Sequence, residues 1–393
     1  MLDRRSVLRE LAATMTPRRG READKEQVHQ RGKRVALYTL SFLGSAFFMP
    51  VLGGYISAKH GWRTQFHIMA VFLGVASILV FFLVPEHAYN RPAIFDTDTS
   101  SHENLSELDE QLAAQDGDTT AADDKPAVGV VVVEKKRTFA QGLSLYNGRF
   151  SDESVVRCLL TPFVLFVYPA TLWSFLFQGT YITWGIAVSL VLAQLFTAAP
   201  YNFNSTQLGY MYAAPFIGSI LSYFAAGAFS DVVAKYMAKR NNNIYEPEFR
   251  ILLVIPVAIV SLPGIFAFGY ATEAATHWIV PSVCYGLLTF GVVMSCAATF
   301  AYMLDAHRDI SVEMMVSVLL LKNFWAFGST FFVNKWVVAD GAKKMFFIIG
   351  AIQTSICILS IGMYVFGKVL RDLVRRWNPL DRLGLYPKDP QAI

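Results

Sequence analysis

The sequence predicts an all-α polytopic membrane protein, and two observations support that prediction. Of the 393 residues, 54% are hydrophobic and only 16% are charged, whereas soluble domains carry about 25% charged residues. The apolar residues are also gathered into long runs. A run of about 20 residues is enough for a helix to cross a bilayer core of about 30 Å. The composition therefore excludes an ordinary soluble enzyme and a largely disordered chain.

Eight apolar runs are long enough to be predicted spans. They are Ala36–Ile56, Phe66–Val84, Cys158–Leu195, Leu208–Phe229, Ile251–Tyr270, Trp278–Ala301, Val312–Val333 and Met345–Gly367. The third run is about twice as long as the others. It can be one long span or two short spans joined by a hinge at Gly179.

The distribution of positive charge distinguishes these two topologies, because Lys and Arg accumulate in cytoplasmic loops. If the third run crosses once, 28 of the 34 Lys and Arg residues lie on one side of the membrane and five on the other. If it crosses twice, the division is 20 against 13. The sequence therefore predicts eight transmembrane helices with both termini cytoplasmic. We expect a multi-pass protein of the plasma membrane, with the vacuolar membrane as the alternative.

These spans divide the chain into five predicted parts. Residues 1–35 form a basic cytoplasmic tail, residues 36–84 hold two spans, and residues 85–157 form a cytoplasmic linker. Residues 158–367 hold six spans, and residues 368–393 form a second cytoplasmic tail. The linker carries ten acidic residues and no Lys or Arg between Asp96 and Asp124, which predicts a self-repelling, disordered segment.

Several functional classes find no support in the sequence. The net charge of +4 is small and predicts no nucleic-acid partner. All four cysteines lie inside apolar runs without metal-ligand spacing, so we expect neither a metal site nor a disulfide framework. There is no HExxH, Walker or GxSxG motif. The sequence therefore predicts a protein that is not an enzyme, that needs no cofactor, and whose partner is the lipid bilayer.

Small residues recur at four-residue spacing within the spans. One stripe consists of Ala214, Gly218, Ser222 and Ala226, a second begins at Ser282 and Gly286, and a third consists of Gly291, Ser295 and Thr299. Such stripes let helix backbones approach closely in a bilayer. We interpret them mainly as packing surfaces between the spans.

Lys322 is the most specific single candidate for a functional site. It lies near the middle of the seventh predicted span and is followed by Asn323. A charge at that depth is expensive and normally faces a cavity or a partner. We predict that Lys322 and Asn323 face a substrate cavity. The alternative is a structural ion pair with an acid near a helix end, such as Asp305.

A second candidate site lies beside Gly179. Gln178, Tyr181 and Trp184 form a polar and aromatic cluster there. Aromatic faces attract cations, so this cluster is predicted to line the same cavity and to suit a cationic or amphipathic ligand. Simple packing between helices is the alternative.

Several short motifs occur in order along the predicted spans. They are PVLGGYI at Pro50–Ile56 with Gly61–Arg63 after it, PEHAYNRP at Pro85–Pro92, APYNF at Ala199–Phe203, GAFSD at Gly227–Asp231, the stretch Tyr245–Arg250, AYMLD at Ala301–Asp305 with Arg308, and LKNF at Leu321–Phe324. Together they resemble transporters of the major facilitator superfamily, in its fungal drug:proton antiporter and polyamine-transporter branch.

The resemblance implies a fold and a mechanism. It implies two six-helix halves with a cavity between them, and a monomer that moves a small-molecule substrate by alternating access, driven by a proton gradient. Residues implied to act in gating are Asp231, Gly227, Arg240, Asp305 and Arg308. Residues implied to pack helices closely are Pro50, Gly53 and Gly54.

The eight predicted spans match only the fifth to the twelfth spans of that family. The resemblance therefore implies a partial amino-terminal half beside a complete six-helix carboxy-terminal half, that is, a truncated form of a transporter. The alternative is a membrane protein that does not transport, either a remnant or a regulatory interaction partner.

Overall fold

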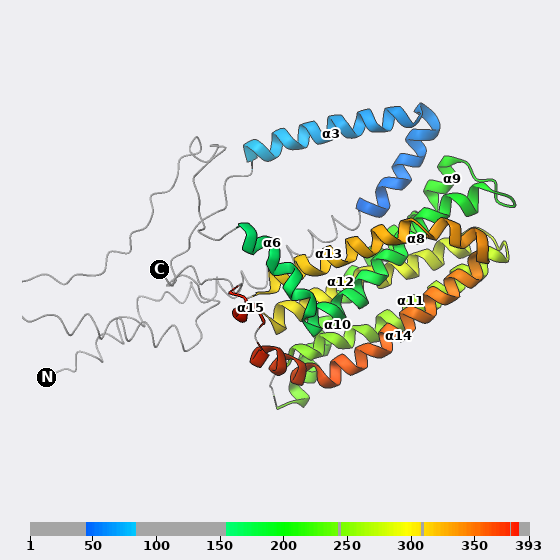
Figure 1. The fold of residues 1–393 in the computed structure, drawn as a ribbon. Coiled ribbons are helices and arrows are strands. Elements are labelled where there is room, and N and C mark those ends of the chain that lie inside the picture. The colour runs from blue at the N-terminus through cyan, green and yellow to red at the C-terminus, as the bar shows by residue number, and fades with distance from the viewer. Residues whose placement is uncertain (1–44, 84–154, 243–244, 308–309, 378, 385–393) are drawn as a thin grey trace, which may run out of the picture. The chain divides into compact units, whose positions relative to one another are not determined.

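The computed structural model describes residues 45–83, 155–242, 245–307, 310–377 and 379–384. All regular elements in these ranges are helices, which confirms the all-α prediction (Figure 1). The described residues belong to two compact units: residues 67–83 lie in one, and residues 45–66 and 156–384 lie in the other. The predicted tail 1–35 and most of the predicted linker at residues 85–157 fall outside the described ranges, whereas residues 368–377 and 379–384 of the second predicted tail are described.

Six of the described helical stretches are long and apolar enough to cross a membrane. They are Trp62–Phe82, Pro169–Thr197, Ser205–Arg240, Pro247–Glu273, Ile279–Ala306 and Val333–Trp377. Each corresponds to one predicted span.

Two predicted spans are not among these six, so the count of eight stays a prediction. The seventh predicted span is helix α13 (Ser311–Thr330), which carries Glu313 and Lys322. The first, Ala36–Ile56, lies partly outside the described residues, and residues 45–60 are helical.

The long third run contains one candidate span, and its interruption is not at Gly179. Helix α6 (Val155–Val164) and the short 3-10 helix η2 (Leu165–Val167) end at Tyr168, whose backbone is extended at ψ 126°. Pro169 explains this break, because a proline disfavours helical geometry in the residue before it. Gly179 itself is helical, at φ −64° and ψ −39°. The alternative hinge at Gly179 is therefore wrong.

After the break the chain continues as one long helical path. Helix α7 (Pro169–Ser174) leads into a π-helical turn, η3 (Phe175–Gly179), and then into α8 (Thr180–Thr197). π-turns inside helices frequently mark functional sites. Here the turn ends at Gly179, between two of the candidate site residues, Gln178 and Tyr181.

Small residues bring α10 (Ala213–Arg240) and α12 (Ile279–Ala306) into backbone contact. A Cβ atom added to Gly218 would overlap the carbonyl oxygen of Gly286, and one added to Gly286 would lie 2.8 Å from the Ala214 carbonyl oxygen. The Ser222 hydroxyl donates a hydrogen bond of 2.7 Å to the Phe290 carbonyl. The first two small-residue stripes therefore pack against each other.

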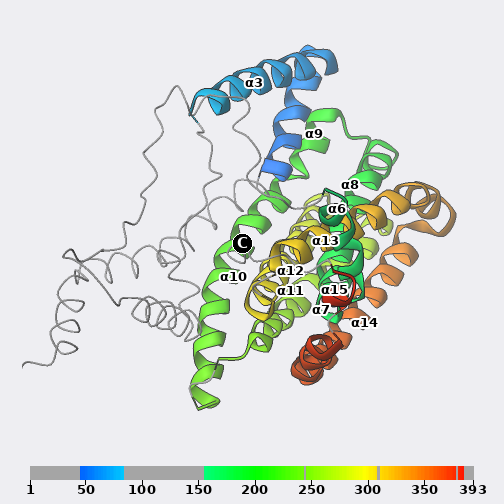
Figure 2. The same cartoon turned by 60° about the vertical axis from the view of Figure 1, so that its left-hand side comes forward.

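The remaining helices complete the bundle around this pair (Figure 2). The 3-10 helix η4 (Pro247–Leu253) leads into α11 (Val254–Glu273), which packs against both α12 and α14 (Val333–Trp377). α14 bends at Gly341, where φ is 77°, a value that glycine adopts without strain. A short helix, α15 (Pro379–Arg382), follows.

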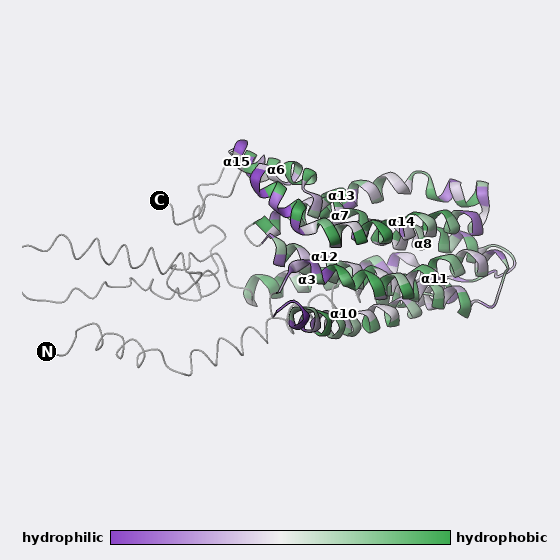
Figure 3. Cartoon of the chain, turned by 90° about the horizontal axis from the view of Figure 1, so that it is seen from below, coloured by the Kyte–Doolittle hydropathy of each residue, from purple (hydrophilic) through white to green (hydrophobic). Residues whose placement is uncertain are grey.

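Three more described helices come before α10 in the chain. Two of them precede the predicted linker, and the third follows α8. Helix α9 (Ser205–Tyr210) begins at Asn204, whose side chain and that of Gln207 cap each other's backbone amides at 2.9 Å and 3.0 Å. Helix α3 (Trp62–Leu83) carries no buried residues in its most apolar window. Figure 3 shows that the bundle helices are hydrophobic over most of their length and that hydrophilic residues gather near helix ends.

Candidate functional site

A buried amide, Gln353, lies at the meeting point of α8 and α14. Its carbonyl oxygen accepts a hydrogen bond of 3.0 Å from the Trp184 indole and one of 2.8 Å from the Thr180 hydroxyl. The Gln353 side chain is 0% exposed, and its amide nitrogen has no partner among the described residues. One acceptor therefore fastens two side chains of α8 to α14.

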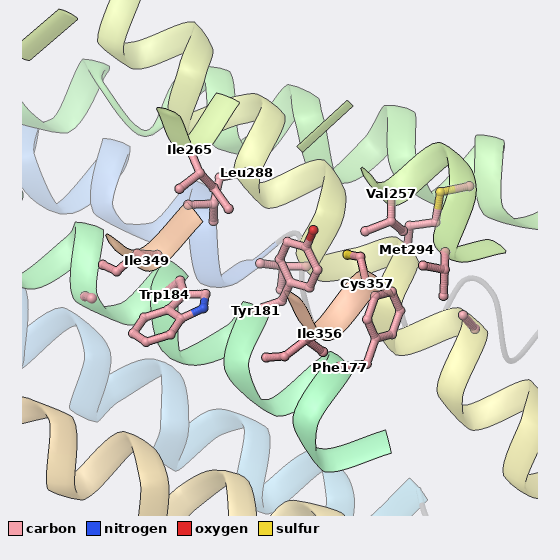
Figure 4. Packing of buried hydrophobic residues seen from close by; sticks show 14 of the residues in the cluster. Phe177, Tyr181, Trp184, Val257, Ile265, Leu288, Met294, Ile349, Ile356 and Cys357 are labelled. Carbon is pink, nitrogen blue, oxygen red and sulfur yellow. The ribbon is translucent and has the colours of Figure 1, made fainter. Parts of the chain in front are cut away.

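Tyr181 makes the equivalent contact to α11. Its hydroxyl lies 2.6 Å from the Ser261 hydroxyl, which donates to the Val257 carbonyl at 2.7 Å. Figure 4 shows Tyr181 among apolar neighbours, with Phe177 and Cys357 beside it. A Cβ atom added to Gly291 would lie 2.5 Å from the Ser261 Cβ. The absence of a side chain at Gly291 thus lets α11 and α12 meet at this hydroxyl pair.

Gln178 contacts α12, the third neighbour of this segment. Its amide oxygen accepts a hydrogen bond of 2.5 Å from the Thr299 hydroxyl. Gln178, Tyr181 and Trp184 are all buried, and each is bonded to a different helix. The three predicted residues therefore lie on one helical segment, and the polar group of each one forms a hydrogen bond within the bundle.

Lys322 is placed differently, at the edge between the buried and the exposed sides of α13. Its side chain is half-buried, whereas Asn323 and Trp325 are exposed. Its Cβ lies 3.5 Å from where a Cβ on Gly179 would be, and its charge lies within electrostatic range of Cys296. The ammonium group forms no hydrogen bond or ion pair with any residue in the described ranges.

The alternative ion pair between Lys322 and Asp305 does not form. Asp305 accepts a hydrogen bond of 3.1 Å from Arg250 and one of 2.5 Å from the Tyr245 hydroxyl. Arg250 also donates to the Tyr245 hydroxyl at 2.9 Å and to the Ser230 hydroxyl. This Arg250 cluster joins Ser230 of α10 and Asp305 in the last turn of α12 to η4. Partial burial and the hydrogen bond to Asp305 raise the pKa of Tyr245 to about 12.

Two further ion pairs join the same end of the bundle to α14. Glu248 is buried and accepts two hydrogen bonds of 2.9 Å from Arg371, a bidentate geometry that strengthens such a pair. Glu246 pairs with Lys368 at 2.9 Å. The hydrogen bond from Lys368 lowers the pKa of the Glu246 carboxyl.

The other residues implied in gating lie near this end but outside the cluster. Asp231 and Gly227 are exposed on α10, and nothing lies within 4 Å of a Cβ added to Gly227. The Arg240 guanidinium lies over the Tyr236 ring, 4.9 Å from its centroid. Arg308 lies outside the described residues. Of the five residues, only Asp305 is in the Arg250 cluster.

The PVLGG motif lies in the helical segment 45–60 and packs against α9. A Cβ added to Gly54 would lie 2.7 Å from the Ser205 carbonyl oxygen, and one added to Gly209 would lie 3.1 Å from the Pro50 carbonyl oxygen. A Cβ added to Gly53 would lie 2.6 Å from the Gln65 side chain. The structure therefore places the small face of this motif at a close helix contact.

Sequence analysis missed two of the organising residues. Gln353 is a lone amide within an apolar run, and that polarity was a signal that could have identified it. Arg250 ends the motif Tyr245–Arg250 that supports the family resemblance, but neither the motif nor its spacing indicated which residues Arg250 would contact. In the described ranges no group of three or more His, Cys, Asp or Glu residues could hold a metal ion.

Comparison with known proteins identifies the family. The model of the Major Facilitator Superfamily matches residues 23–311. An uncharacterized MFS-type transporter of Schizosaccharomyces pombe is 26% identical over 368 residues, which cover 87% of this chain and 63% of that protein. Protein HOL1 of Saccharomyces cerevisiae is 22% identical, covering 89% of this chain and 67% of that protein. The MFS-type transporter penM of Penicillium rubens is 23% identical, covering 90% and 63%.

The chain thus spans about two thirds of the length of these relatives. No solved structure gives a significant match to it. The family match covers well over half of the sequence and coincides with the apolar helices described above. This protein therefore belongs to the Major Facilitator Superfamily.

Proposed function

We propose that this protein acts in secondary active transport of small organic solutes, by alternating access and with coupling to protons. The proposed substrates are drugs, polyamines or other amphipathic and cationic molecules. The single observation that carries the proposal is Lys322, a half-buried cation near the middle of α13 without a partner among the described residues.

The energetic argument rests on the position of that charge. An unpaired Lys at the centre of a span costs about 2.5–3.5 kcal/mol on insertion scales, and more where it faces lipid. A hydrated solute path beside α13 would remove most of this cost. Asn323 and Trp325 are exposed next to Lys322, so such a path would also offer an amide and an aromatic ring to a solute.

The three buried residues of α7–α8 have a supporting role in this proposal. Gln178, Tyr181 and Trp184 hold the π-turn against α12, α11 and α14. The turn lies close to Lys322, because a Cβ added to Gly179 would lie 3.5 Å from the Lys322 Cβ. These residues would therefore shape the wall of the path, and a shift of the turn would move that wall.

The Arg250 cluster is proposed to act as a latch at the end of the bundle. It ties α10, η4 and α12 together through Ser230, Tyr245 and Asp305. Asp231, Arg240 and Arg308 lie nearby in the sequence, and Asp231 is exposed and available to a second surface. The proposed gating role is supported by the place of Arg240 and Asp305 in the last turns of α10 and α12, helix ends that would move in alternating access.

A reconstitution experiment tests the transport proposal. The chain is placed in liposomes with an imposed pH gradient, and uptake of a labelled panel of organic cations and neutral drugs is measured. Lys322→Ala should reduce transport at least tenfold. Lys335→Ala, which removes an exposed Lys just beyond α13, should not. If the unaltered chain moves no compound under the gradient, or if Lys322→Ala transports at the unaltered rate, the proposal fails.

A further inference from the structure

The end of the bundle at which α10 and α14 finish carries more positive charge than its acids neutralise. Four acids there are each paired with a base: Asp305 with Arg250, Glu246 with Lys368, Glu248 with Arg371, and Asp372 with Arg376. These pairs leave Lys235, Lys239 and Arg240 of α10 and Arg375 of α14 without a carboxylate partner in the described ranges. Exposed Arg382 follows on α15. Asp231 of α10, Glu313 in the first turn of α13 and Asp381 of α15 are the further acids of this end in those ranges, fewer than the five cations.

These cations lie at one end of the same bundle. Glu246 and Glu248 flank the start of η4, and both are bonded to α14. Arg250, in the middle of η4, donates a hydrogen bond to Ser230 of α10. The carboxyl-terminal parts of α10 and α14 are therefore both bonded to the chain at η4.

α14 is too long to end within the hydrocarbon core. From Ala342 to Trp377 it measures about 54 Å at 1.5 Å per residue, whereas the core is about 30 Å thick. Its final turns must therefore lie at the depth of the headgroups or beyond. Those turns hold Arg375, Arg376 and Trp377.

The same turns continue an apolar stripe. Phe366, Val369, Leu373 and Trp377 are all exposed, and their spacing of three or four residues places them on one face of the helix. Trp is enriched at the membrane interface, and Arg side chains reach from an apolar surface towards headgroups. An apolar stripe that ends in Trp among arginines matches a lipid surface better than a soluble ligand.

We propose that this end of the bundle binds anionic phospholipid headgroups, with Arg375 and Arg382 as their principal partners and Leu373 and Trp377 against the acyl chains. Lys239 and Arg240 of α10 extend the positive surface. Each Lys or Arg near an anionic membrane adds to the attraction between the two, so the exposed cations together favour anionic over zwitterionic lipid. The proposal concerns the lipid partner and is independent of the solute.

Native mass spectrometry of the detergent-purified chain tests this proposal. Binding of phosphatidylserine is titrated against phosphatidylcholine with the same acyl chains. The unaltered chain should prefer phosphatidylserine, and Arg375→Gln with Arg382→Gln should weaken that preference roughly tenfold or more. The matched control, Lys335→Gln with Lys343→Gln, removes two cations at the other end of α14 and should keep it.

A charge-conserving variant separates lost charge from lost structure. Arg375→Lys with Arg382→Lys should retain the preference for phosphatidylserine, because the headgroup contact needs positive charge at these positions. Equal binding of the two lipids by the unaltered chain would overturn the proposal. So would a Gln variant that keeps the preference, or a control variant that loses it to the same extent.

Discussion

Polar residues inside the bundle fall into two groups, according to whether their partners lie within it. Gln178, Tyr181, Trp184 and Gln353 are buried and bonded to neighbouring helices. Lys322 is half-buried and has no such bond in the described ranges. The first group stabilises the bundle, whereas Lys322 needs water, a solute or another part of the protein.

A substitution at Gln353 tests the stabilising group. Gln353→Leu should lower the free energy of unfolding by about 1–3 kcal/mol, because the Trp184 indole and the Thr180 hydroxyl would lose their buried acceptor. Interhelical hydrogen bonds in membranes average about 0.6 kcal/mol, so the effect should exceed that of one ordinary bond. Unfolding in detergent, followed by tryptophan fluorescence, measures it.

The control for this prediction lies on the same helix. Ser355→Ala removes an exposed hydroxyl that bonds only to the Ala351 carbonyl of its own helix, and it should leave stability within about 0.5 kcal/mol of the unaltered chain. If Gln353→Leu is no less stable than this control, the amide does not fasten α8 to α14.

At the residue scale, sequence analysis singles out polar side chains that interrupt an apolar run, although it missed Gln353. Lys322 and Gln178 stand out for that reason. Sequence analysis did not identify the partner of Asp305, because the partner of an acid at a helix end depends on which loop folds over that end. Here η4 brings Arg250 to Asp305, and no spacing in the sequence predicts that meeting.

Among the elements, the pair α10–α12 shows most clearly how the sequence determines helix packing. The stripe on α10 and the stripe on α12 meet backbone to backbone at Gly218 and Gly286. Lipid tails provide no hydrophobic drive for helices to associate, so such contacts contribute through close packing. The four-residue spacing alone predicted these surfaces, although it did not indicate which stripe meets which.

Two glycines of α10 provide a matched test of this contact. Gly218→Ala should destabilise the protein by about 1–3 kcal/mol, because the new methyl group overlaps the Gly286 carbonyl and the helices must separate. Gly227→Ala adds the same methyl group where nothing lies within 4 Å. It should be neutral or stabilising by about 0.5–1 kcal/mol, since Ala is the better helix former.

Thermal unfolding of the two variants in the same detergent provides the comparison. An equal midpoint for Gly218→Ala and Gly227→Ala would mean that the α10–α12 contact is loose enough to absorb a methyl group. That result would contradict the close packing described above.

The third apolar run shows why hinge positions are harder to predict than spans. Glycine can adopt many backbone conformations. Gly179 nevertheless stays helical, because Gln178 and Tyr181 on either side of it are held by α12 and α11. The helix breaks instead at Tyr168, because the ring of the following proline clashes with helical geometry in the residue before it. Tertiary contacts therefore keep the backbone helical at Gly179, whereas the covalent geometry of Pro169 breaks the helix at Tyr168.

For the whole molecule, composition and run length predicted the membrane fold, and the ordered motifs predicted the family that the comparison then showed. The face of α13 around Lys322 could not be interpreted from these features alone, because its role depends on what lies opposite it. The structure shows that the bundle itself provides no partner for this face within the described ranges. The central claim is therefore that the face lines a hydrated solute path.

Thiol accessibility tests this claim most directly, because it needs no knowledge of the substrate. Asn323→Cys places a thiol on the exposed face beside Lys322, and Ile259→Cys places one on the exposed apolar face of α11. The parent chain, which keeps its four cysteines, gives the background, and Cys284, Cys296 and Cys357 are buried in it. A charged, membrane-impermeant methanethiosulfonate is applied to the protein in liposomes. The thiol introduced by Asn323→Cys should react at least tenfold faster than that introduced by Ile259→Cys, and equally slow reaction of the two would contradict a hydrated path at Lys322.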